Sequence, residues 1–135
     1  LTMLKLAQER ERLSIVADQI GAPTSARLIA DTTAHCIKQA MRDRLVGSFS
    51  SDLYHLTNSG QTSWFGFTQE IIKIASNDLN MSLIIKDISA IPTSDYPTPA
   101  TRPMNSQLAL SKLENAFTLK MPDWKDSLST CLAEI

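Results

Sequence analysis

The side chains best suited to metal or thiol chemistry in this sequence are two histidines and two cysteines. His35 and Cys36 are neighbours, but His55 and Cys131 lie far along the chain, so the set lacks metal-ligand spacing. A catalytic cysteine needs a neighbouring base, and no base accompanies either thiol. We therefore expect no metal centre and no thiol enzyme. His35 should face solvent, His55 should be packed or hydrogen-bonded, and both cysteines should act as small hydrophobes.

Signatures of dinucleotide binding and hydride transfer are missing from the chain. A phosphate-binding turn needs closely spaced glycines between a strand and a helix. None of the glycines forms that pattern (Gly21, Gly47, Gly60 and Gly66). Neither Tyr54 nor Tyr96 has a lysine four residues later, so a Tyr-x-x-x-Lys reductase pair is also missing. We expect that this polypeptide by itself binds no NAD(P) and transfers no hydride.

One arginine stands out because of its surroundings. Arg102 follows a stretch in which prolines restrict the backbone, and Pro103, Asn105 and Ser106 come directly after it. Its guanidinium offers a planar fork of donors that suits a phosphate. An arginine after a proline-rich loop is more often simply solvated. From the residues alone both interpretations stay open, a phosphate contact and a solvated surface side chain.

The composition describes one globular domain. Its 135 residues are enough for a core, and 43% of them are hydrophobic. The 13 basic and 14 acidic residues give a net charge of −1, which argues against a nucleic-acid or anionic-membrane binder. No apolar run reaches the ~20 residues of a membrane span, and no signal peptide is visible. Two cysteines give no disulfide framework, so we expect a reducing, cytoplasmic location.

The elements that would position these residues are helices with a few short strands. Capping residues and apolar periodicity predict helices over residues 1–12, 24–44, 62–75, 111–117 and 122–135. Runs of β-type residues predict strands at 13–16, 52–56 and 82–87. The prolines of residues 91–103 predict an extended, irregular segment. We expect a helix-dominated α/β fold with two or three strands. The opening at Leu1 rather than Met indicates a piece of something longer.

Apolar stripes on three helices predict the core. They are Ile29, Cys36, Ile37 and Ala40; then Trp64, Phe67, Ile71, Ile72 and Ala75; and finally Trp124, Leu128, Cys131, Leu132 and Ile135. Thr24 or Ser25 should cap the second helix and Thr62 or Ser63 the third. Ser111 should cap the fourth, and Pro122 should begin the last.

Three separated blocks of the sequence resemble one known family. They are ADQIGAPTSARLIAD (17–31), LYHLTNSGQTSWFGF (53–67) and PTSDYPTPATRPMNSQL (92–108), and the ending KLENAFTLKMPDWKDSLSTCLAEI continues the match. Together they are similar to the dTDP-4-dehydrorhamnose reductases, which are extended short-chain dehydrogenases. The similarity covers essentially the whole chain in order, which makes it far more specific than any single block.

The resemblance implies a function that composition alone does not reach. The family has an N-terminal Rossmann domain and a C-terminal nucleotide-sugar domain, and it uses NADPH or NADH to reduce dTDP-4-dehydro-L-rhamnose to dTDP-L-rhamnose. This chain matches the C-terminal part. The family's glycine-rich loop and Tyr-x-x-x-Lys lie upstream of that part, which accounts for their absence here. The expected domain is therefore residues 1–135, a substrate-binding fragment with no catalytic residue of its own.

The resemblance also assigns residues. Arg102 and Pro103 match the family's Arg-Pro-x-Asn-Ser segment, so Arg102 is expected to stabilise the diphosphate and Asn105 to support the loop by hydrogen bonds. Gln19 and Thr24, in the DQ-x-G-x-P-T loop, are expected to shape the substrate site. The family often has a further arginine before Arg102 and another after Asn105-Ser106; this chain has Thr101 and Gln107 there.

Some family members hold Mg²⁺ at a dimer interface through three glutamates. Glu134 matches one of these positions, whereas Arg27 occupies another with the opposite charge. A hard cation tolerates that exchange poorly, so we expect no Mg²⁺-dependent dimer. An Arg27–Glu134 salt bridge in place of the metal is the alternative arrangement.

A second function class stays open at this stage. The same fold family includes the regulatory β subunit of methionine adenosyltransferase, a non-catalytic module that serves a partner protein. The expected partners of the first reading are a dTDP-sugar, the chain's own N-terminal Rossmann domain and a further copy of itself, since a fragment cut from its parent exposes apolar surface.

Overall fold

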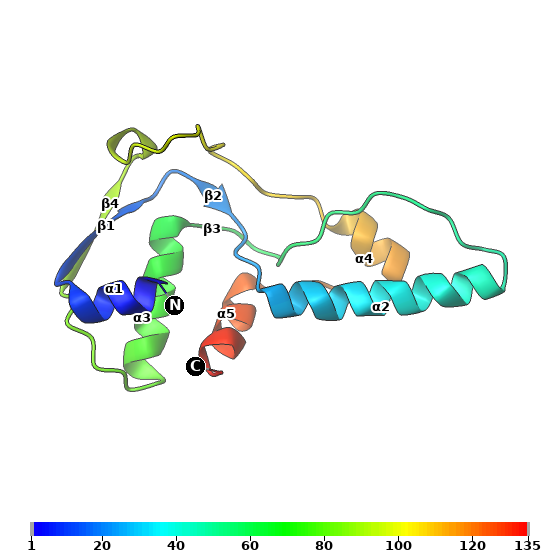
Figure 1. The fold of residues 1–135 in the computed structure, drawn as a ribbon, viewed down its shortest axis with the longest axis horizontal. Coiled ribbons are helices and arrows are strands. Elements are labelled where there is room, and N and C mark those ends of the chain that lie inside the picture. Colours follow the sequence, from blue (N-terminus) through cyan, green and yellow to red (C-terminus); the bar gives the residue numbers. More distant parts are fainter. Residues whose placement is uncertain (1, 135) are drawn as a thin grey trace.

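The computed structural model describes residues 2–134 and shows helices arranged around a few short strands (Figure 1). In chain order the elements are α1 (Thr2–Glu9), β1 (Arg12–Val16), β2 (Ile20–Gly21), α2 (Ala26–Leu45), β3 (Thr62–Ser63), α3 (Trp64–Asn77), β4 (Asp87–Ile91), a 3₁₀ turn η1 (Thr93–Asp95), α4 (Ser111–Phe117) and α5 (Trp124–Leu132). The expected helix-dominated α/β fold is confirmed.

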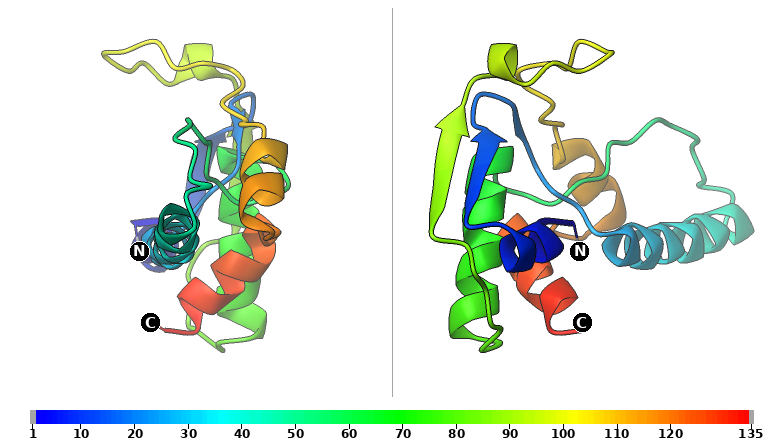
Figure 2. Two further views of the ribbon diagram at one scale, coloured as in Figure 1. Left: turned by 90° about the vertical axis from the view of Figure 1, so that its right-hand side faces the viewer. Right: turned by 60° about the vertical axis from the view of Figure 1, so that its left-hand side comes forward.

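Two of the strands, β1 and β4, form a parallel pair. The register matches Arg12 with Asp87 and ends with Val16 opposite Ile91. Leu13, Ile15 and Val16 are buried, because β1 packs against α3 and α1. In the right-hand view of Figure 2 both arrowheads point to the same end of the molecule, where η1 and the following loop lie. Parallel pairing therefore delivers the two chain segments that follow these strands to one place.

A second, smaller sheet lies beyond the end of β1. β2 and β3 are antiparallel, with Ile20 opposite Ser63 and Gly21 opposite Thr62. Ile20 also forms an isolated parallel bridge with Asn105. The DQ-x-G-x-P-T loop after β1 is thus hydrogen-bonded on both sides.

The core joins α1, α3 and α5. Its buried members are Leu4, Ile71, Ile74, Ala75, Trp124, Leu128 and Leu132. The rings of Phe67 and Trp124 meet edge to face with centroids 6.1 Å apart. The predicted stripes of α3 and α5 are largely confirmed, but Trp64 is 53% exposed and Cys131 is exposed. α3 covers only the side of α5 that carries Trp124, Leu128 and Leu132. Ile135 lies outside the described residues.

The predicted stripe on α2 does not face a core. Ile29 is 43% exposed and Ile37 is 55% exposed, and Thr32 is the buried residue of this helix. In Figure 1 α2 extends away from α1, α3 and α5. It touches α4 through polar contacts, because His35 Nε2 lies 3.2 Å from the carbonyl oxygen of Phe117. Its apolar side is left without a cover among residues 2–134.

Two strand predictions were wrong. Residues 52–56 form no strand, and His55 is exposed rather than packed. This segment is held by side chains on α4: Asp52 pairs with Lys112 at 2.6 Å, and the Tyr54 ring meets Phe117 edge to face at 5.0 Å. Such contacts give the segment a fixed place without a partner strand.

The strand predicted at 82–87 begins only at Asp87. The amides of Ile84 and Ile85 donate to the carbonyl of Ala7 at the end of α1, each at 3.1 Å. The run is therefore hydrogen-bonded to α1 and packs Leu83 against the core, while Ile84 stays 46% exposed. The weaker β-type sequence of residues 87–91 pairs with β1.

Three of the described helix starts follow local capping rules. Ser25 accepts from the Leu28 amide, Ser63 from the Gly66 amide, and Asp123 from the Lys125 amide. The prediction for Ser111 was wrong, because Leu110 precedes α4 and makes no side-chain cap. The last helix begins at Trp124, two residues after Pro122. Within residues 2–134, none of the helices combines the length and apolar character needed to span a membrane.

Candidate functional site

A carboxylate directly after β1 holds the residue that follows β4. The Thr93 amide donates to both carboxylate oxygens of Asp18, at 3.0 and 2.9 Å, and the Thr93 hydroxyl donates to Oδ1 at 2.6 Å. Gln19 Nε2 donates to the same hydroxyl oxygen at 3.1 Å. Because Val16 pairs with Ile91, Asp18 and Thr93 each lie two residues past the last strand pair. We call this group the Thr93 anchor.

A second anchor lies at Ile20. Its amide donates to the carbonyl of Met104 at 2.8 Å, and its carbonyl accepts from the amide of Ser106 at 2.9 Å. The Ser106 hydroxyl also donates to that carbonyl at 3.1 Å. Residues 94–103, which we call the proline-rich loop, are therefore tied at both ends to residues 18–20. The segment is irregular and exposed, as the prolines predicted.

Gly21 lies close to the Ser106 side chain of the second anchor. A Cβ atom built at this position would lie 2.7 Å from Oγ of Ser106, closer than such atoms pack. Asn105 stiffens the same turn, because its Oδ1 accepts from the Gln107 amide at 2.9 Å. The expectation that Asn105 supports its loop by a hydrogen bond agrees with this contact.

Arg102 lies in the proline-rich loop, two residues before Met104. It is exposed, and among residues 2–134 none of the ion pairs involves it. Its guanidinium is thus available to a ligand, and the nearby anchor limits how far it can move. The structure brings Gln19, Asn105 and Arg102 to one end of the molecule, whereas Glu134 and Arg27 lie together elsewhere.

Asn58 joins the loop after β2 to α5. It is 2% exposed. Its backbone amide donates to Thr24 Oγ1 at 3.0 Å, and its side-chain Nδ2 donates to the Pro23 carbonyl at 2.6 Å. Its Oδ1 accepts from the Ser127 hydroxyl at 2.8 Å. Thr24 therefore shapes the loop rather than pointing freely outward.

A recess opens beside this asparagine. Its volume is about 340 Å³. The lining residues are Ala22, Thr57, Asn58, Ser59, Gly60, Gln61, Gln107, Leu108 and Leu110. The recess adjoins the end of the proline-rich loop, because Gln107, one of its lining residues, directly follows Ser106 of the second anchor. The lining includes hydroxyl and amide side chains as well as apolar ones.

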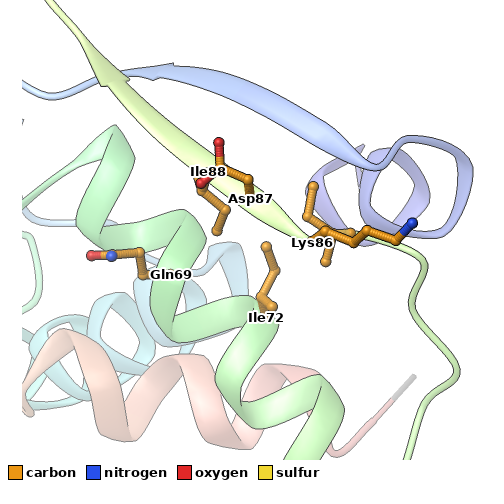
Figure 3. Close-up of a pocket in the computed structure, with 6 residues that line it drawn as sticks. Gln69, Ile72, Lys86, Asp87 and Ile88 are labelled. Carbon is orange, nitrogen blue, oxygen red and sulfur yellow. The ribbon is translucent and has the colours of Figure 1, made fainter.

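A second hollow, of about 230 Å³, lies between α3 and β4 (Figure 3). Its lining residues are Gln69, Ile72, Ile85, Lys86, Asp87 and Ile88. The charged groups there are already engaged: Lys86 pairs with Glu11 at 2.7 Å, and Asp87 accepts from the Ser89 hydroxyl at 3.1 Å. We do not assign a function to this hollow.

The Thr93 anchor lowers the pKa of Asp18 below its ordinary value of 3.8, chiefly through the Thr93 hydroxyl bond and then the Thr93 amide. Because the pKa of Asp18 is lower in the folded state, ionised Asp18 stabilises the fold when the pH is above the ordinary pKa of the carboxyl group. That stabilisation is lost as the pH falls through the lower pKa of the folded state. We predict that ¹³C NMR places the Asp18 midpoint below 3.8 and that Thr93→Val raises it. A wild-type midpoint at or above the ordinary value, unmoved by Thr93→Val, would contradict the anchor.

Arg27 and Glu134 form an ion pair that links the start of α2 to the residue two positions past α5. Arg27 also lies 3.9 Å from Asp31 on its own helix. Both partners of the pair are at least half exposed, so its contribution to stability is about 1 kcal/mol or less. Within residues 2–134, no three His, Cys, Asp or Glu side chains converge as a metal site would require. The salt-bridge alternative is the arrangement seen.

The family comparison settles the kind of domain. The RmlD substrate binding domain family matches residues 1–135, the full length of the sequence. The chain belongs to this family. The resemblance stated from the sequence is thereby confirmed, and the loop, anchors and recess described above are features of an RmlD substrate binding domain.

Similar proteins carry consistent names. The chain is 47% identical to the dTDP-4-dehydrorhamnose reductase of Burkholderia thailandensis over 135 residues, covering 99% of the chain and 45% of that protein. It is 42% identical to the Escherichia coli K12 reductase, covering 99% of the chain and 43% of that protein. A crystal structure of the Bacillus anthracis reductase in complex with NADP superimposes with a TM-score of 0.74 at 32% identity, covering 99% of this chain and 42% of that one.

This RmlD substrate binding domain spans less than half the length of the curated relatives it matches. Its own residues do not fit a dinucleotide: in the part that the structure describes, no glycine-rich turn joins a strand to a helix, and β1 leads instead into Asp18 and the Thr93 anchor.

The sequence missed Asp18, Thr93 and Asn58 as site residues. The signal for the first two was available in principle, since each is a polar residue two positions beyond a strand end. It required the correct place of β4, which propensity did not provide. Asn58 carried no such signal, because its three partners come from distant segments.

Proposed function

We propose that this chain is the substrate-binding part of an NAD(P)H-dependent dTDP-4-dehydrorhamnose reductase, the enzyme that converts dTDP-4-dehydro-L-rhamnose to dTDP-L-rhamnose. Residues 1–135 form its sugar-nucleotide domain, and an N-terminal Rossmann domain completes the protein. The names of the relatives and the NADP complex of a similar structure support this reading.

The observation that carries the proposal is an exposed arginine on a loop with two fixed ends, next to a polar recess. Arg102 donates from its fork to the diphosphate, which is the most charged part of a dTDP-sugar. Asn105 holds the turn behind it. Gln19 acts through the Thr93 anchor and shapes the loop without touching substrate. The recess beside Asn58 takes an uncharged part of the ligand.

The role of these residues is to bind and orient. Holding the sugar nucleotide in one pose turns the meeting of substrate and hydride donor into an intramolecular step, which accounts for a large part of catalytic rate in general. The nicotinamide cofactor supplies the hydride, and the Rossmann domain binds it. No group of this chain between residues 2 and 134 is assigned to the chemical step.

The direct test of the activity uses the full-length protein with dTDP-4-dehydro-L-rhamnose and either NADPH or NADH. Consumption of the reduced cofactor together with formation of dTDP-L-rhamnose supports the proposal. The rival, a non-catalytic regulatory module of the same fold, predicts no turnover with either cofactor and a stable complex with a partner protein. Absence of turnover by a folded, cofactor-binding protein would therefore reject the reductase assignment.

The uncovered apolar side of α2 supports packing against further protein. Ile37, Met41 and Leu45 recur one helical turn apart and are 55%, 63% and 88% exposed. We assign this surface to contacts with the Rossmann domain or a second copy of the chain.

The free Cys36 and Cys131 suit a reducing compartment, and we propose the cytoplasm.

Magnesium should leave the oligomeric state unchanged. The Arg27 guanidinium is already paired with the Glu134 carboxylate, so a metal cation bound there would lie next to a positive charge. We predict the same sedimentation coefficient for the full-length protein in Mg²⁺ and in EDTA. Arg27→Glu, which creates three neighbouring carboxylates with Asp31 and Glu134, is the matched variant. A Mg²⁺-induced dimer of the wild-type protein would contradict this expectation.

A further inference from the structure

The proline-rich loop that carries Arg102 is tied to a single three-residue segment. Thr93, at its start, is held by Asp18 and Gln19, and Met104, at its end, is held by Ile20. Pro97, Pro99 and Pro103 restrict the backbone between the two anchors. The conformations open to the loop are therefore set by both anchors together.

The two anchors differ in kind. The anchor at Ile20 is made of backbone hydrogen bonds, supplemented by the Ser106 hydroxyl. The anchor at Thr93 depends on a side chain, because the Asp18 carboxylate accepts both from the Thr93 amide and from the Thr93 hydroxyl. A substitution at one position can therefore release one end of the loop while the strands and the other end stay in place.

We propose that Asp18 is a positioning residue for Arg102: by holding Thr93 it restricts the proline-rich loop to conformations in which the guanidinium meets the diphosphate. The inference rests on the proposed function. Asp18 does not contact the ligand in this account. Both of its carboxylate oxygens already accept from Thr93, and its effect reaches Arg102 through the loop backbone.

The physical reason is the entropy of the loop. With both ends held, the loop samples few conformations, and little ordering is left to accompany ligand binding. With Thr93 released, the chain is held only up to Ile91 at the end of β4, so the loop gains Pro92 and Thr93 and loses its fixed direction of departure from the strand. The ligand must then order this longer loop. This cost falls on binding and is the same for the ground state and the transition state, so it raises KM and leaves kcat unchanged.

The test compares variants of the full-length reductase. Asp18→Asn and Thr93→Val each weaken the Thr93 anchor, and we expect KM for the dTDP-sugar to rise about tenfold, with kcat within about twofold of wild type. Thr93→Ser restores the hydroxyl and should return KM toward the wild-type value. Asp43→Asn removes a carboxylate on α2, away from both anchors, and controls for the lost negative charge.

A double-mutant cycle separates positioning from general stability. If Asp18 acts through Arg102, Asp18→Asn adds little to KM in an Arg102→Ala background, so the two effects are non-additive. Additive effects, an unchanged KM in Asp18→Asn, or a loss of kcat equal to the loss of kcat/KM would overturn the proposal. A wild-type protein without turnover would instead reject the reductase assignment, so the two failures are distinguishable.

Discussion

Arg102→Ala should raise KM for the dTDP-sugar roughly 30-fold, since charge-assisted hydrogen bonds of about 2 kcal/mol are lost. The side chain is exposed and lies outside every ion pair found within residues 2–134, so its removal leaves no partner unsatisfied. The diphosphate does not react, and its contacts persist unchanged into the transition state. For this reason kcat should stay within about twofold.

Steady-state kinetics of the full-length protein checks this expectation. Arg102→Lys keeps the charge but loses the planar fork, and it should fall between wild type and Arg102→Ala. Arg42→Ala removes another exposed arginine, from α2, and controls for general loss of positive charge. Wild-type KM and kcat in Arg102→Ala would show that the arginine is only solvated, which is the alternative left open by the sequence.

Trp124→Ala should destabilise the 135-residue chain by about 3–5 kcal/mol. Trp124 is 5% exposed in the core, its ring meets Phe67 edge to face at 6.1 Å, and its amide donates to the Ser59 carbonyl at 3.2 Å. Truncation leaves a large cavity between α3 and α5. It keeps the backbone hydrogen bond to Ser59 but removes the indole that lies beside Gly60, a residue of the recess lining. Urea unfolding followed by far-ultraviolet circular dichroism measures the change.

Trp64→Ala is the matched control, because Trp64 is 53% exposed at the start of α3. It should cost about 1 kcal/mol or less in the same chain. Equal losses for the two tryptophans would mean that the core does not run through α5 as described. The comparison also checks the helical stripe of α3, on which sequence periodicity placed Trp64 together with Ile71 and Ala75.

Local signals predicted the helices well. A serine cap for α2 and α3 and a proline for α5, each followed by apolar residues at helical spacing, identified where these helices start to within about two residues. These signals are contained in short stretches of chain. The α2 stripe shows their limit, because periodicity predicts which side of a helix is apolar but does not say whether anything in the same chain covers it.

Strand pairing was the part that sequence could not provide. The run Ser82–Asp87 has the stronger β-type composition. The strand that pairs with β1 is nevertheless Asp87–Ile91, in a register that ends with Val16 opposite Ile91. That register is a long-range choice. It decides that Asp18 meets Thr93, so an error of five residues in the strand hides the whole anchor. Arg102 stood out from its proline-rich surroundings, but only the family resemblance gave Arg102 and Asn105 a role.

Hydrogen exchange by mass spectrometry tests most directly whether this domain holds the sugar nucleotide. The full-length protein is compared with and without saturating dTDP-L-rhamnose. We predict that, within this chain, protection gathers in residues 18–24, 57–61 and 92–108, which form the anchors, the recess and the proline-rich loop. The outer end of α2 (38–45) should be unchanged and serves as the internal reference. Bound ligand without protection in residues 92–108 would contradict the account.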